Sequence, residues 1–548
     1  MTNPAPQSLM MRGDWSKIVP LVLLGALAAG LETRSSTIIG GIAPIMDFTL
    51  IVIGAVALRA AFASSDLGWR LPWRRPSTVI VLAFLCCLAA GWLGGVSWPN
   101  SGDEYSYVFL ADTLRSGRLW VPAPPDPYLF FAAHVSVKDG MMFSPYPPGW
   151  SALLAPFRAL GVGWLTNPLL TVLLGVALAG CARRLKLSPA IQTSALSLVL
   201  LTPFTAFLGG SLFPQTISAA VVACIVWVQL TDEARPGIAK KLLIGALFGA
   251  LMLIRYDVCL IVAVVYAADR LACRRTRVFG DGLWVVLGAL PFVGCLLAYD
   301  AAITGNPLQL TAYWDSPEIL GSAIQGLPTS LGWRILALNL YWLGGLAQFG
   351  GLPVLVLSVI GLAVKIRRRT CRFYDFMLPA AVLFYSFLPF TGGHQYGPRY
   401  WFWAWPLAML TITTALADEA GQLRAFGRHF SFEGLAAASL VYATAAFCVL
   451  LVTTHVYIQA RRSVFDVPPP QVRSVILIPR RLLVLWPWQY AYIHAMSYDF
   501  TRNDLDFAAP VLYGSADVPN SEARACRLGG RAVFLWEPPG RLRPVACP

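Results

Sequence analysis

Long apolar runs alternate with short polar segments along most of this chain. A helix that crosses the hydrocarbon core of a bilayer needs about 20 predominantly apolar residues. Runs of that kind with few charges inside them predict a polytopic α-helical membrane protein with about thirteen transmembrane helices. The candidate spans are Ile18–Leu31, Ile38–Phe62, Val79–Val96, Gly163–Ala182, Ala195–Leu212, Ile217–Leu230, Leu242–Ile254, Val258–Ala268, Leu283–Tyr299, Tyr341–Val364, Phe376–Phe390, Trp401–Leu416 and Leu435–Ile458.

The connections between these spans differ in charge. Short loops rich in Lys and Arg stay in the cytoplasm, and every second connection carries such a cluster. The clusters are Arg70/Arg74/Arg75, Arg183/Arg184/Lys186, Arg235/Lys240/Lys241, Arg270/Arg274/Arg275/Arg277, Lys365/Arg367/Arg368/Arg369/Arg372 and Arg424/Arg428. This pattern predicts a cytoplasmic N-terminus, retained as an anchor because no small-residue cleavage site follows Leu31. It also puts residues 97–161, residues 300–340 and the tail after Gln459 together on the outer face.

The sequence predicts two domains. Residues 1–458 form a transmembrane module whose first outer loop spans 97–161, and residues 459–548 form an extracytoplasmic C-terminal domain. This tail contains strand-like runs at Ser474–Ile478 and Ala532–Trp536, separated by Pro, Gly and Asp turn residues. We therefore expect a small α/β domain there.

Composition excludes the other broad classes of protein. Hydrophobic residues make up 57% of the chain, against about 45–50% in soluble domains, and charged residues make up 13%, against about 25%. The mean hydropathy is +0.62. The net charge of +14 does not indicate nucleic-acid binding, because the basic residues lie in short tracts between apolar runs. Only Cys526 and Cys547 of the eleven cysteines lie in the tail, where an oxidising compartment would allow a disulfide; the sequence leaves this pairing open.

The first outer loop opens with two adjacent acidic residues. Asp103 and Glu104 stand in Ser101-Gly102-Asp103-Glu104-Tyr105-Ser106-Tyr107, directly after an apolar span. They are candidates for a general base or for metal ligands at the membrane surface. An isolated pair of this kind is also typical of a helix N-terminus, where the helix dipole favours negative charge. The loop continues with a predicted amphipathic helix ending in Ser116-Gly117-Arg118-Leu119 and with Tyr146-Pro147-Pro148-Gly149-Trp150 at its re-entry.

In this order, the elements resemble the GT-C superfamily of membrane glycosyltransferases. Within it they resemble glycosyltransferase family 39, the relatives of protein O-mannosyltransferases and of the aminoarabinose transferase that modifies lipid A. Three later segments are similar to segments of that family: Gly245 and Gly249 leading into Arg255, Tyr299-Asp300 followed by Thr304-Gly305-Asn306-Pro307-Leu308, and Gly397-Pro398-Arg399-Tyr400. The resemblance runs from about Ser97 to Tyr400. It departs at Tyr256, where the family commonly has proline.

The resemblance implies transfer of a sugar from a polyprenyl-monophosphate carrier to an acceptor on the outer face, with inversion at the anomeric carbon. An inverting displacement needs a base near the acceptor hydroxyl and positive charge on the departing phosphate. We assign the base to Asp103, with Glu104 assisting through acceptor binding or a metal. Phosphate binding is assigned to Arg399 and then Arg255, because planar guanidinium donors match phosphate oxygens. The alternative for Arg399 is that it extends from a helix end to the surface.

Five further residues are predicted to line the substrate site: Tyr107, His134, Tyr146, His394 and Tyr400. Aromatic residues also form the ordinary belt at a membrane interface, and Tyr146 is the one that we favour for stacking on the sugar or the prenyl chain. The two histidines lack the spacing of a metal site, which favours a structural or hydrogen-bonding role over metal binding. We predict no obligatory cofactor or metal, with a divalent ion as the alternative.

Two other classes of function stay open. A transporter or flippase also carries charged residues and broken helices in the membrane, but it is expected to show two halves with matching interrupted spans. A lipid-linked glycan ligase or polymerase would share the fold and place its key loop late in the chain. Oligosaccharyltransferase is disfavoured because Tyr313-Trp314-Asp315 is not followed by the glycine-bearing motif of that family.

The expected partners are a polyprenyl-phosphate sugar, a glycan, lipid or protein acceptor, and the lipid bilayer, but no nucleic acid. We expect a bacterial inner-membrane protein with a periplasmic C-terminus. The sugar is left open among mannose, arabinose, aminoarabinose, glucose and galacturonic acid.

Overall fold

The computed structural model describes residues 71–548, except 72, 131, 133, 231–236, 274–277, 313–341, 344, 347, 387–395, 417–421, 426–427, 463–469, 480, 487–488, 495–502 and 538–540. Two predicted spans, Ile18–Leu31 and Ile38–Phe62, and the predicted site residue His394 therefore lie outside the described residues.

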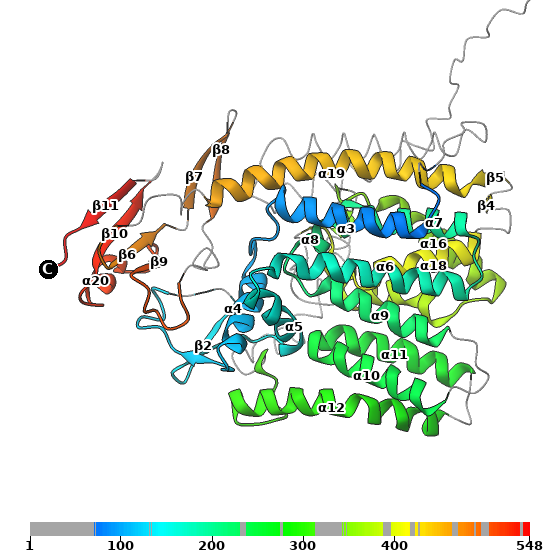
Figure 1. The fold of residues 1–548 in the computed structure, drawn as a ribbon, viewed down its shortest axis with the longest axis horizontal. Coiled ribbons are helices and arrows are strands. Elements are labelled where there is room, and N and C mark those ends of the chain that lie inside the picture. The colour runs from blue at the N-terminus through cyan, green and yellow to red at the C-terminus, as the bar shows by residue number, and fades with distance from the viewer. Residues whose placement is uncertain are drawn as a thin grey trace, which may run out of the picture.

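Helices make up most of the described chain, and the long ones run alongside one another as a bundle (Figure 1). The helices are α3 (Pro76–Trp92), α4 (Gly102–Arg115), α5 (Pro148–Ala159), α6 (Thr166–Arg184), α7 (Pro189–Leu200), α8 (Pro203–Gly210), α9 (Gln215–Gln229), α10 (Ile238–Ile254), α11 (Tyr256–Cys273), α12 (Val278–Thr304), α16 (Leu352–Arg368), α17 (Met377–Ser386), α18 (Ala408–Leu416), α19 (Phe432–Arg462) and α20 (Ser521–Cys526). Within the bundle α6 packs against α9, α3 against α8, and α10 against α12. Gly245 and Gly288 allow the last pair to approach closely, because a Cβ at Gly245 would stand 2.0 Å from the Val285 carbonyl oxygen.

The predicted number of thirteen spans is not confirmed. Within the described residues, Gly163–Arg184, Gly282–Thr304 and Phe432–Val452 are long and apolar enough to cross a bilayer, and α7 with α8 would make a fourth crossing. Several other apolar helices are shorter than a full span, among them α3 and α9.

The predicted span Ala195–Leu212 is wrong as a single helix. The structure has α7 and α8 there, bent by 63° at the break. Pro203 begins α8, and the Thr202 side chain accepts a hydrogen bond from the Thr205 backbone N–H. Proline lacks the N–H that would continue the preceding helix and disfavours helical conformation in the residue before it, so an apolar run that reads as one span folds as two helices.

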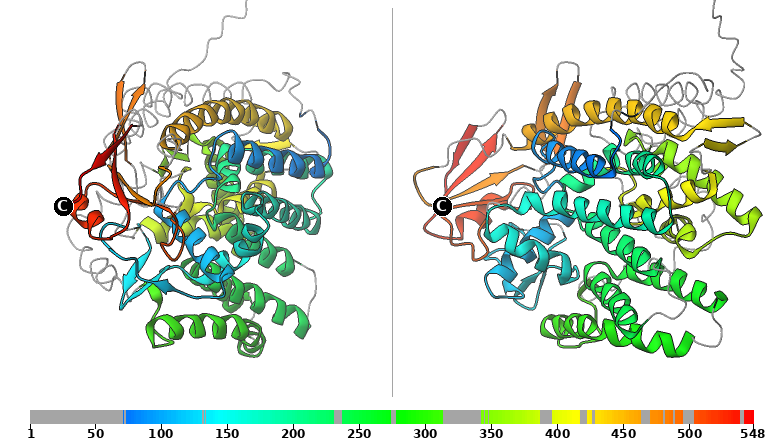
Figure 2. Two further views of the ribbon diagram at one scale, coloured as in Figure 1. Left: turned by 60° about the vertical axis from the view of Figure 1, so that its left-hand side comes forward. Right: turned by 45° about the vertical axis from the view of Figure 1, so that its right-hand side comes forward.

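The first outer loop folds as α4, a small sheet and α5. The sheet is antiparallel with the order β1-β3-β2, formed by β1 (Val121–Pro122), β2 (Ser136–Lys138) and β3 (Met141–Phe143). This loop and the C-terminal sheet lie at the same end of the bundle in all three views (Figures 1 and 2). Arg118 Nη1 lies 2.7 Å from Asp506 Oδ1 of the tail, which agrees with the prediction that the two segments share a face.

The C-terminal tail contains the predicted strands. A four-stranded sheet with the order β11-β10-β6-β9 combines two parallel pairs with one antiparallel pair, and α20 packs on it. Its strands are β6 (Ser474–Ile478), β9 (Val511–Ser515), β10 (Ala532–Glu537) and β11 (Arg541–Val545). The prediction of a small α/β unit is thus confirmed at Ser474–Ile478 and Ala532–Trp536. The predicted boundary near residue 459 falls inside the last turns of α19, which ends at Arg462.

Two hairpins complete the described strands. They are β4 (Gln422–Ala425) with β5 (Arg428–Ser431), and β7 (Arg481–Trp486) with β8 (Gln489–His494). The first lies at the end of the bundle opposite to the C-terminal sheet (Figure 1).

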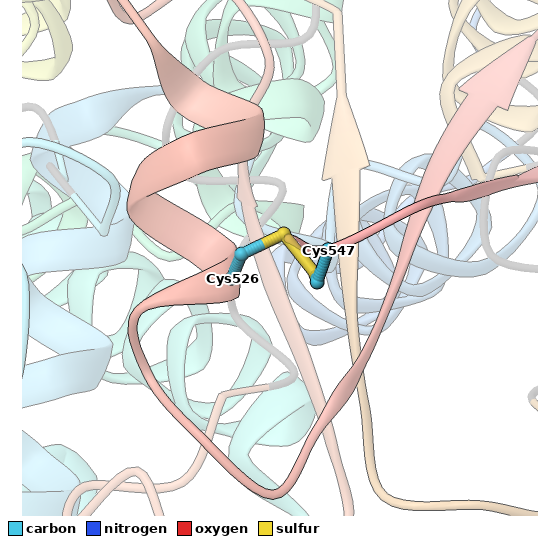
Figure 3. The surroundings of a disulfide bond; sticks show 2 residues. All are labelled: Cys526 and Cys547. Carbon is cyan, nitrogen blue, oxygen red and sulfur yellow. A yellow bond between two sulfur atoms is a disulfide. The ribbon is translucent and has the colours of Figure 1, made fainter.

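A disulfide joins Cys526 at the end of α20 to Cys547 beyond β11 (Figure 3). Their Cα atoms are 5.4 Å apart, within the usual range for such a bridge. The pairing that the sequence left open is therefore present in the structure. A disulfide on this sheet fits a face that meets an oxidising compartment.

Candidate active site

The acidic pair lies in the first turn of α4, where the sequence predicted a helix start. Ser101 is the N-cap residue, and its hydroxyl accepts a hydrogen bond from the Glu104 backbone N–H at 3.1 Å. Both acidic side chains therefore stand at the positive end of the helix dipole. Although adjacent in the chain, they make entirely different contacts.

Asp103 accepts hydrogen bonds from two residues that lie far from it in the chain. Its Oδ2 lies 2.6 Å from Arg399 Nη2, and its Oδ1 accepts a hydrogen bond from the Tyr146 hydroxyl. His134 Nδ1 lies 3.9 Å from the same Oδ1. The Asp103 side chain keeps 18% of its surface exposed, so it can still be reached from outside the protein.

Arg399 begins the short 3-10 turn η4 (Arg399–Trp401) that follows Gly397. Gly397 has a φ of +86°, and a Cβ there would also meet the Phe204 ring, so glycine is needed at this position of the Gly-Pro-Arg-Tyr segment. The Arg399 guanidinium stacks over the Phe213 ring, with 4.3 Å from Cζ to the ring centroid. Arg399 is only 5% exposed, and within the described part of the chain its Nε and Nη1 have no hydrogen-bond partner.

Unpartnered donors on a buried cation are unusual in proteins. A buried charge without its hydrogen bonds costs several kcal/mol, and most buried polar groups are satisfied. Beside Asp103, Arg399 therefore has two N–H-bearing nitrogens that are available to a further acceptor. Phosphate oxygens are acceptors of the kind that a guanidinium binds best.

The charge of Arg399 controls the protonation of Asp103. Burial by itself raises the pKa of the Asp103 carboxyl, but Arg399, His134 and the hydrogen bond from Tyr146 outweigh it and lower this pKa to about 2. The carboxylate is therefore ionised at neutral pH, and in this state it is a weak base.

Arg255 lies at the break between α10 and α11 and is already neutralised by a neighbour. Its guanidinium makes a two-point ion pair with Asp257, which also accepts a hydrogen bond of 2.7 Å from the Tyr385 hydroxyl. The Tyr400 ring lies between the two arginines, 5.3 Å from Arg255 Cζ and 5.4 Å from Arg399 Cζ. The structure thus brings both predicted phosphate-binding arginines to one tyrosine, and Arg399 differs from Arg255 in having two buried nitrogens without a hydrogen-bond partner among the described residues.

Glu104 has contacts that differ from the role predicted for it. The residue is completely buried. Its Oε1 accepts a hydrogen bond from the Leu212 backbone N–H at 3.0 Å, and its Oε2 accepts bonds from the Asn100 backbone N–H at 2.9 Å and the Ser101 hydroxyl at 3.3 Å. Oε1 thus ties α4 to the segment between α8 and α9, and Oε2 holds the turn that precedes α4. This geometry favours a structural role over acceptor or metal binding.

Replacing Glu104 by Gln should destabilise the protein. Burial raises the pKa of Glu104 to about 7, while the donors from Leu212 and Asn100 oppose that rise. Each carboxyl oxygen can accept a backbone hydrogen bond whether or not the group is protonated, whereas a Gln amide nitrogen would face an N–H donor. We expect the free energy of unfolding at pH 5 to fall by about 1–3 kcal/mol, measured by thermal unfolding in detergent.

The linkage of Glu104 gives this measurement an internal check. A carboxyl whose folded pKa lies above its unfolded value of 4.5 contributes stability that is present at low pH and lost as the pH rises through about 7. Glu104→Gln should remove this dependence. The difference between the two proteins should therefore narrow above pH 7, and equal stability at pH 5 would contradict the role of Glu104 in tying α4 to Leu212.

The other predicted substrate residues gather around Asp103. The rings of Tyr107 and Tyr146 lie 4.6 Å apart between centroids, and Tyr146 Oη is 3.4 Å from His134 Nδ1. The Tyr400 ring stacks on Tyr385 at 5.0 Å. Four of the five predicted residues, Tyr107, His134, Tyr146 and Tyr400, thus cluster at the site.

Several contributors to the site were missed from the sequence. Phe213, Tyr385 and Leu212 carry no local signal, because each is an ordinary residue in or next to an apolar run. Asn100 donates from Nδ2 to the Tyr396 hydroxyl at 3.1 Å, and this contact also ties the acidic pair to the Arg399 segment. Among the described residues, no group of three His, Cys, Asp or Glu side chains is placed to hold a metal ion.

Comparison with known proteins places the fold. No family model and no curated protein matches the sequence. The crystal structure of ArnT from Cupriavidus metallidurans bound to undecaprenyl phosphate aligns with a TM-score of 0.52 at 13% identity, over 84% of this chain and 92% of that one. The Archaeoglobus fulgidus oligosaccharyltransferase, solved with a tethered acceptor peptide, aligns with a TM-score of 0.40 at 11% identity over 86% and 74% of the two chains. The mycobacterial arabinofuranosyltransferase AftD aligns with a TM-score of 0.41 at 13% identity, over 84% of this chain and 35% of that one.

The chain is a helical protein that shares its fold with the ArnT crystal structure, in agreement with the fold that the GT-C resemblance implied. The likeness to ArnT from Cupriavidus metallidurans extends over nearly all of that protein at low sequence identity, so it establishes the fold alone.

Proposed function

We propose that this protein is a family 39-like glycosyltransferase that moves a sugar from a polyprenyl-monophosphate carrier to an acceptor hydroxyl on the outer face of a bacterial inner membrane. The observation that carries the proposal is the buried Arg399 guanidinium, which is paired with Asp103 through one nitrogen and has two nitrogens without partners. ArnT, which has a similar fold, was solved bound to undecaprenyl phosphate. A polyprenyl phosphate is the lipid product of the proposed reaction.

The chemistry is a direct displacement with inversion. The acceptor hydroxyl gives its proton to Asp103, its oxygen attacks the anomeric carbon, and the bond from that carbon to the phosphate oxygen breaks. The phosphate leaves with the bonding electron pair as polyprenyl phosphate. Positive charge held at the leaving oxygen stabilises the transition state, and Arg399 supplies this charge.

Arg399 has to change partners for this reaction to proceed. In the structure it holds Asp103 in the weakly basic state with a pKa of about 2. A donor phosphate on the free nitrogens shares the guanidinium with Asp103 and brings a second negative charge close to the carboxylate. Both effects raise the pKa of Asp103, because they reduce the net positive charge near it. Asp103 thus becomes a better base only when the donor is in place.

This exchange of partners predicts a difference between two pH profiles. The acid limb of kcat/KM for the donor reports the free enzyme, and that of kcat reports the donor complex. In both, activity rises with pH as Asp103 loses its proton, and we expect the limb of kcat to lie at the higher pH. His134, Glu104, Tyr107, Tyr146 and Tyr400 also face this region, so the difference should persist in His134→Gln. Coincident limbs would contradict the exchange.

Arg255 and the aromatic residues have supporting roles in this proposal. The ion pair with Asp257 leaves Arg255 little net charge, so we propose that it fixes Tyr400 against Arg399 and binds phosphate only secondarily. Tyr146 and Tyr107 offer stacked rings for the sugar or for the first prenyl unit. We propose Glu104 as a positioning residue for Asp103.

The direct test is transfer by the purified protein. It is incubated with a panel of polyprenyl-phosphate sugars and a mixture of envelope acceptors, and release of polyprenyl phosphate is measured. We expect release with one sugar of the panel and none with the corresponding diphosphate carriers. Release from diphosphate carriers alone would favour a ligase or polymerase, and transport of a lipid-linked sugar across vesicles without release would favour a flippase.

A further inference from the structure

A segment of the first outer loop is anchored in the C-terminal sheet. We call residues 126–130 the strap. Leu129 is completely buried and Phe130 nearly so, and both belong to the apolar core of that sheet together with Val475, Leu477 and Leu512. The Ser515 backbone N–H at the end of β9 donates to the Leu129 carbonyl at 2.9 Å. The outer loop thus supplies part of the core of a unit that lies more than 300 residues further along the chain.

Polar contacts fix the strap as well. Asp126 Oδ2 lies 2.9 Å from Arg524 Nη1 of α20, and the Arg524 guanidinium also stacks over the Tyr128 ring at 5.0 Å. Asp126 Oδ1 accepts the backbone N–H groups of Tyr128 and Leu129 at 3.0 and 2.9 Å. The strap is therefore held by an ion pair, a turn and an apolar anchor.

The chain reaches the candidate active site four residues after Phe130. His134 has a φ of +58°, a left-handed conformation that a residue other than glycine rarely adopts unless its surroundings impose it. Its side chain is 55% exposed, and its Nδ1 lies 3.9 Å from Asp103 Oδ1 and 3.4 Å from Tyr146 Oη. Ala132 and Val135, on either side of it, pack with Tyr105 and Phe109 of α4.

We infer that the C-terminal domain positions His134 against Asp103 through the strap, and that Leu129 and Arg524 are positioning residues of the active site. This inference rests on the proposed function. An exposed histidine in a strained backbone conformation has little of its own to hold it in place. The anchors on both sides of it, one in the C-terminal core and one on α4, supply the restraint. The C-terminal domain then acts on catalysis without touching substrate.

The test measures the contact between His134 and Asp103 and does not depend on sugar transfer. The full-length protein is labelled at its five histidines, and the His134 imidazole signal is assigned by its loss in His134→Gln. In the wild-type protein Asp103→Asn should shift this signal, because the two side chains are neighbours. In Leu129→Ala the same substitution should produce no shift. An equal response in both backgrounds would overturn the inference.

A matched control separates positioning from general loss of stability. Ile476 is 3% exposed and lies on the face of β6 opposite to the Leu129 core, so Ile476→Ala removes a buried apolar side chain without touching the strap. The response to Asp103→Asn should survive in Ile476→Ala. If Leu129→Ala does not fold, Arg524→Gln replaces it, since this variant removes the guanidinium contacts with Asp126 and Tyr128 but leaves Leu129 in the core, and we expect it to reduce the response.

Kinetics give a second readout if transfer is found. A double-mutant cycle compares Leu129→Ala, His134→Gln and the double variant, since residues that act through one another are not additive. The double variant should be no slower in kcat than His134→Gln alone, whereas Ile476→Ala combined with His134→Gln should be additive. If no transfer is found but the spectroscopic response is intact, the proposed function is refuted and the inference about the strap is retained. Additive kinetics in the Leu129 cycle would refute the inference about the strap.

Discussion

Replacing Asp103 by Asn is expected to reduce the rate of sugar transfer by about 10²- to 10⁴-fold, the usual contribution of a general base. The Asn oxygen can still accept a hydrogen bond from Arg399 or Tyr146, so the local structure should survive, but the side chain can no longer take up a proton. The effect should appear in kcat, since Asp103 meets the acceptor hydroxyl during the reaction. It is measured as the initial rate of polyprenyl-phosphate release from saturating donor.

Asp112 provides a control for Asp103 on the same helix. It lies nine residues further along α4 and makes a two-point ion pair with Arg158, with an Nη2 to Oδ2 distance of 2.6 Å. Asp112→Asn therefore removes a paired carboxylate of α4 away from the proposed reaction centre. We expect it to lower stability without a comparable loss of kcat. Full activity of Asp103→Asn in purified protein would exclude Asp103 as the base.

Replacing Arg399 by Ala is expected to weaken binding of polyprenyl phosphate by about 10- to 100-fold, because a hydrogen bond to a charged group contributes roughly 1.5–3 kcal/mol. The variant also leaves Asp103 without its counter-charge, and burial then raises the pKa of that carboxyl. Arg399→Lys keeps the positive charge but loses the planar set of donors, so it should recover only part of the affinity. Binding of the sugar-free carrier is measured directly, which avoids any dependence on catalysis.

The matched control for Arg399 is Arg158, a second outer arginine that is paired with a carboxylate of α4. Its guanidinium makes a two-point ion pair with Asp112 and is 31% exposed, whereas Arg399 is buried with two nitrogens free. Arg158→Ala should leave carrier affinity unchanged. Unchanged affinity in Arg399→Ala would show that its free donors serve another acceptor.

The two arginines of the site illustrate why residue type alone does not define a role. Arg255 and Arg399 are both near Tyr400 and both match family segments, yet Asp257 neutralises the first while the second shares one nitrogen with Asp103. A buried cation that is only partly paired retains the capacity to bind another anion, and a fully paired one has little left. Of the two, Arg399 is the one that we propose as the main phosphate-binding group.

The amino-acid sequence determined the features that depend on neighbours along the chain. The apolar runs predicted most of the described helices approximately, the charge of Asp103 and Glu104 was typical of the helix N-terminus at which they lie, and Ser474–Ile478 was predicted as a strand. The order of the motifs indicated the GT-C fold, because each motif is a short local pattern whose succession is visible without a structure.

Tertiary structure alone decided what these residues do to one another. Asp103 and Arg399 are 296 residues apart, and Glu104 and Leu212 are 108 apart, so no local pattern could reveal that Asp103 meets a buried arginine while Glu104 meets a backbone N–H. The bend between α7 and α8 and the entry of Leu129 into the C-terminal core are likewise long-range outcomes. Hydrophobic patterning selects helices and strands through short-range periodicity, whereas charge pairing and burial depend on how those elements pack, and packing brings distant segments together.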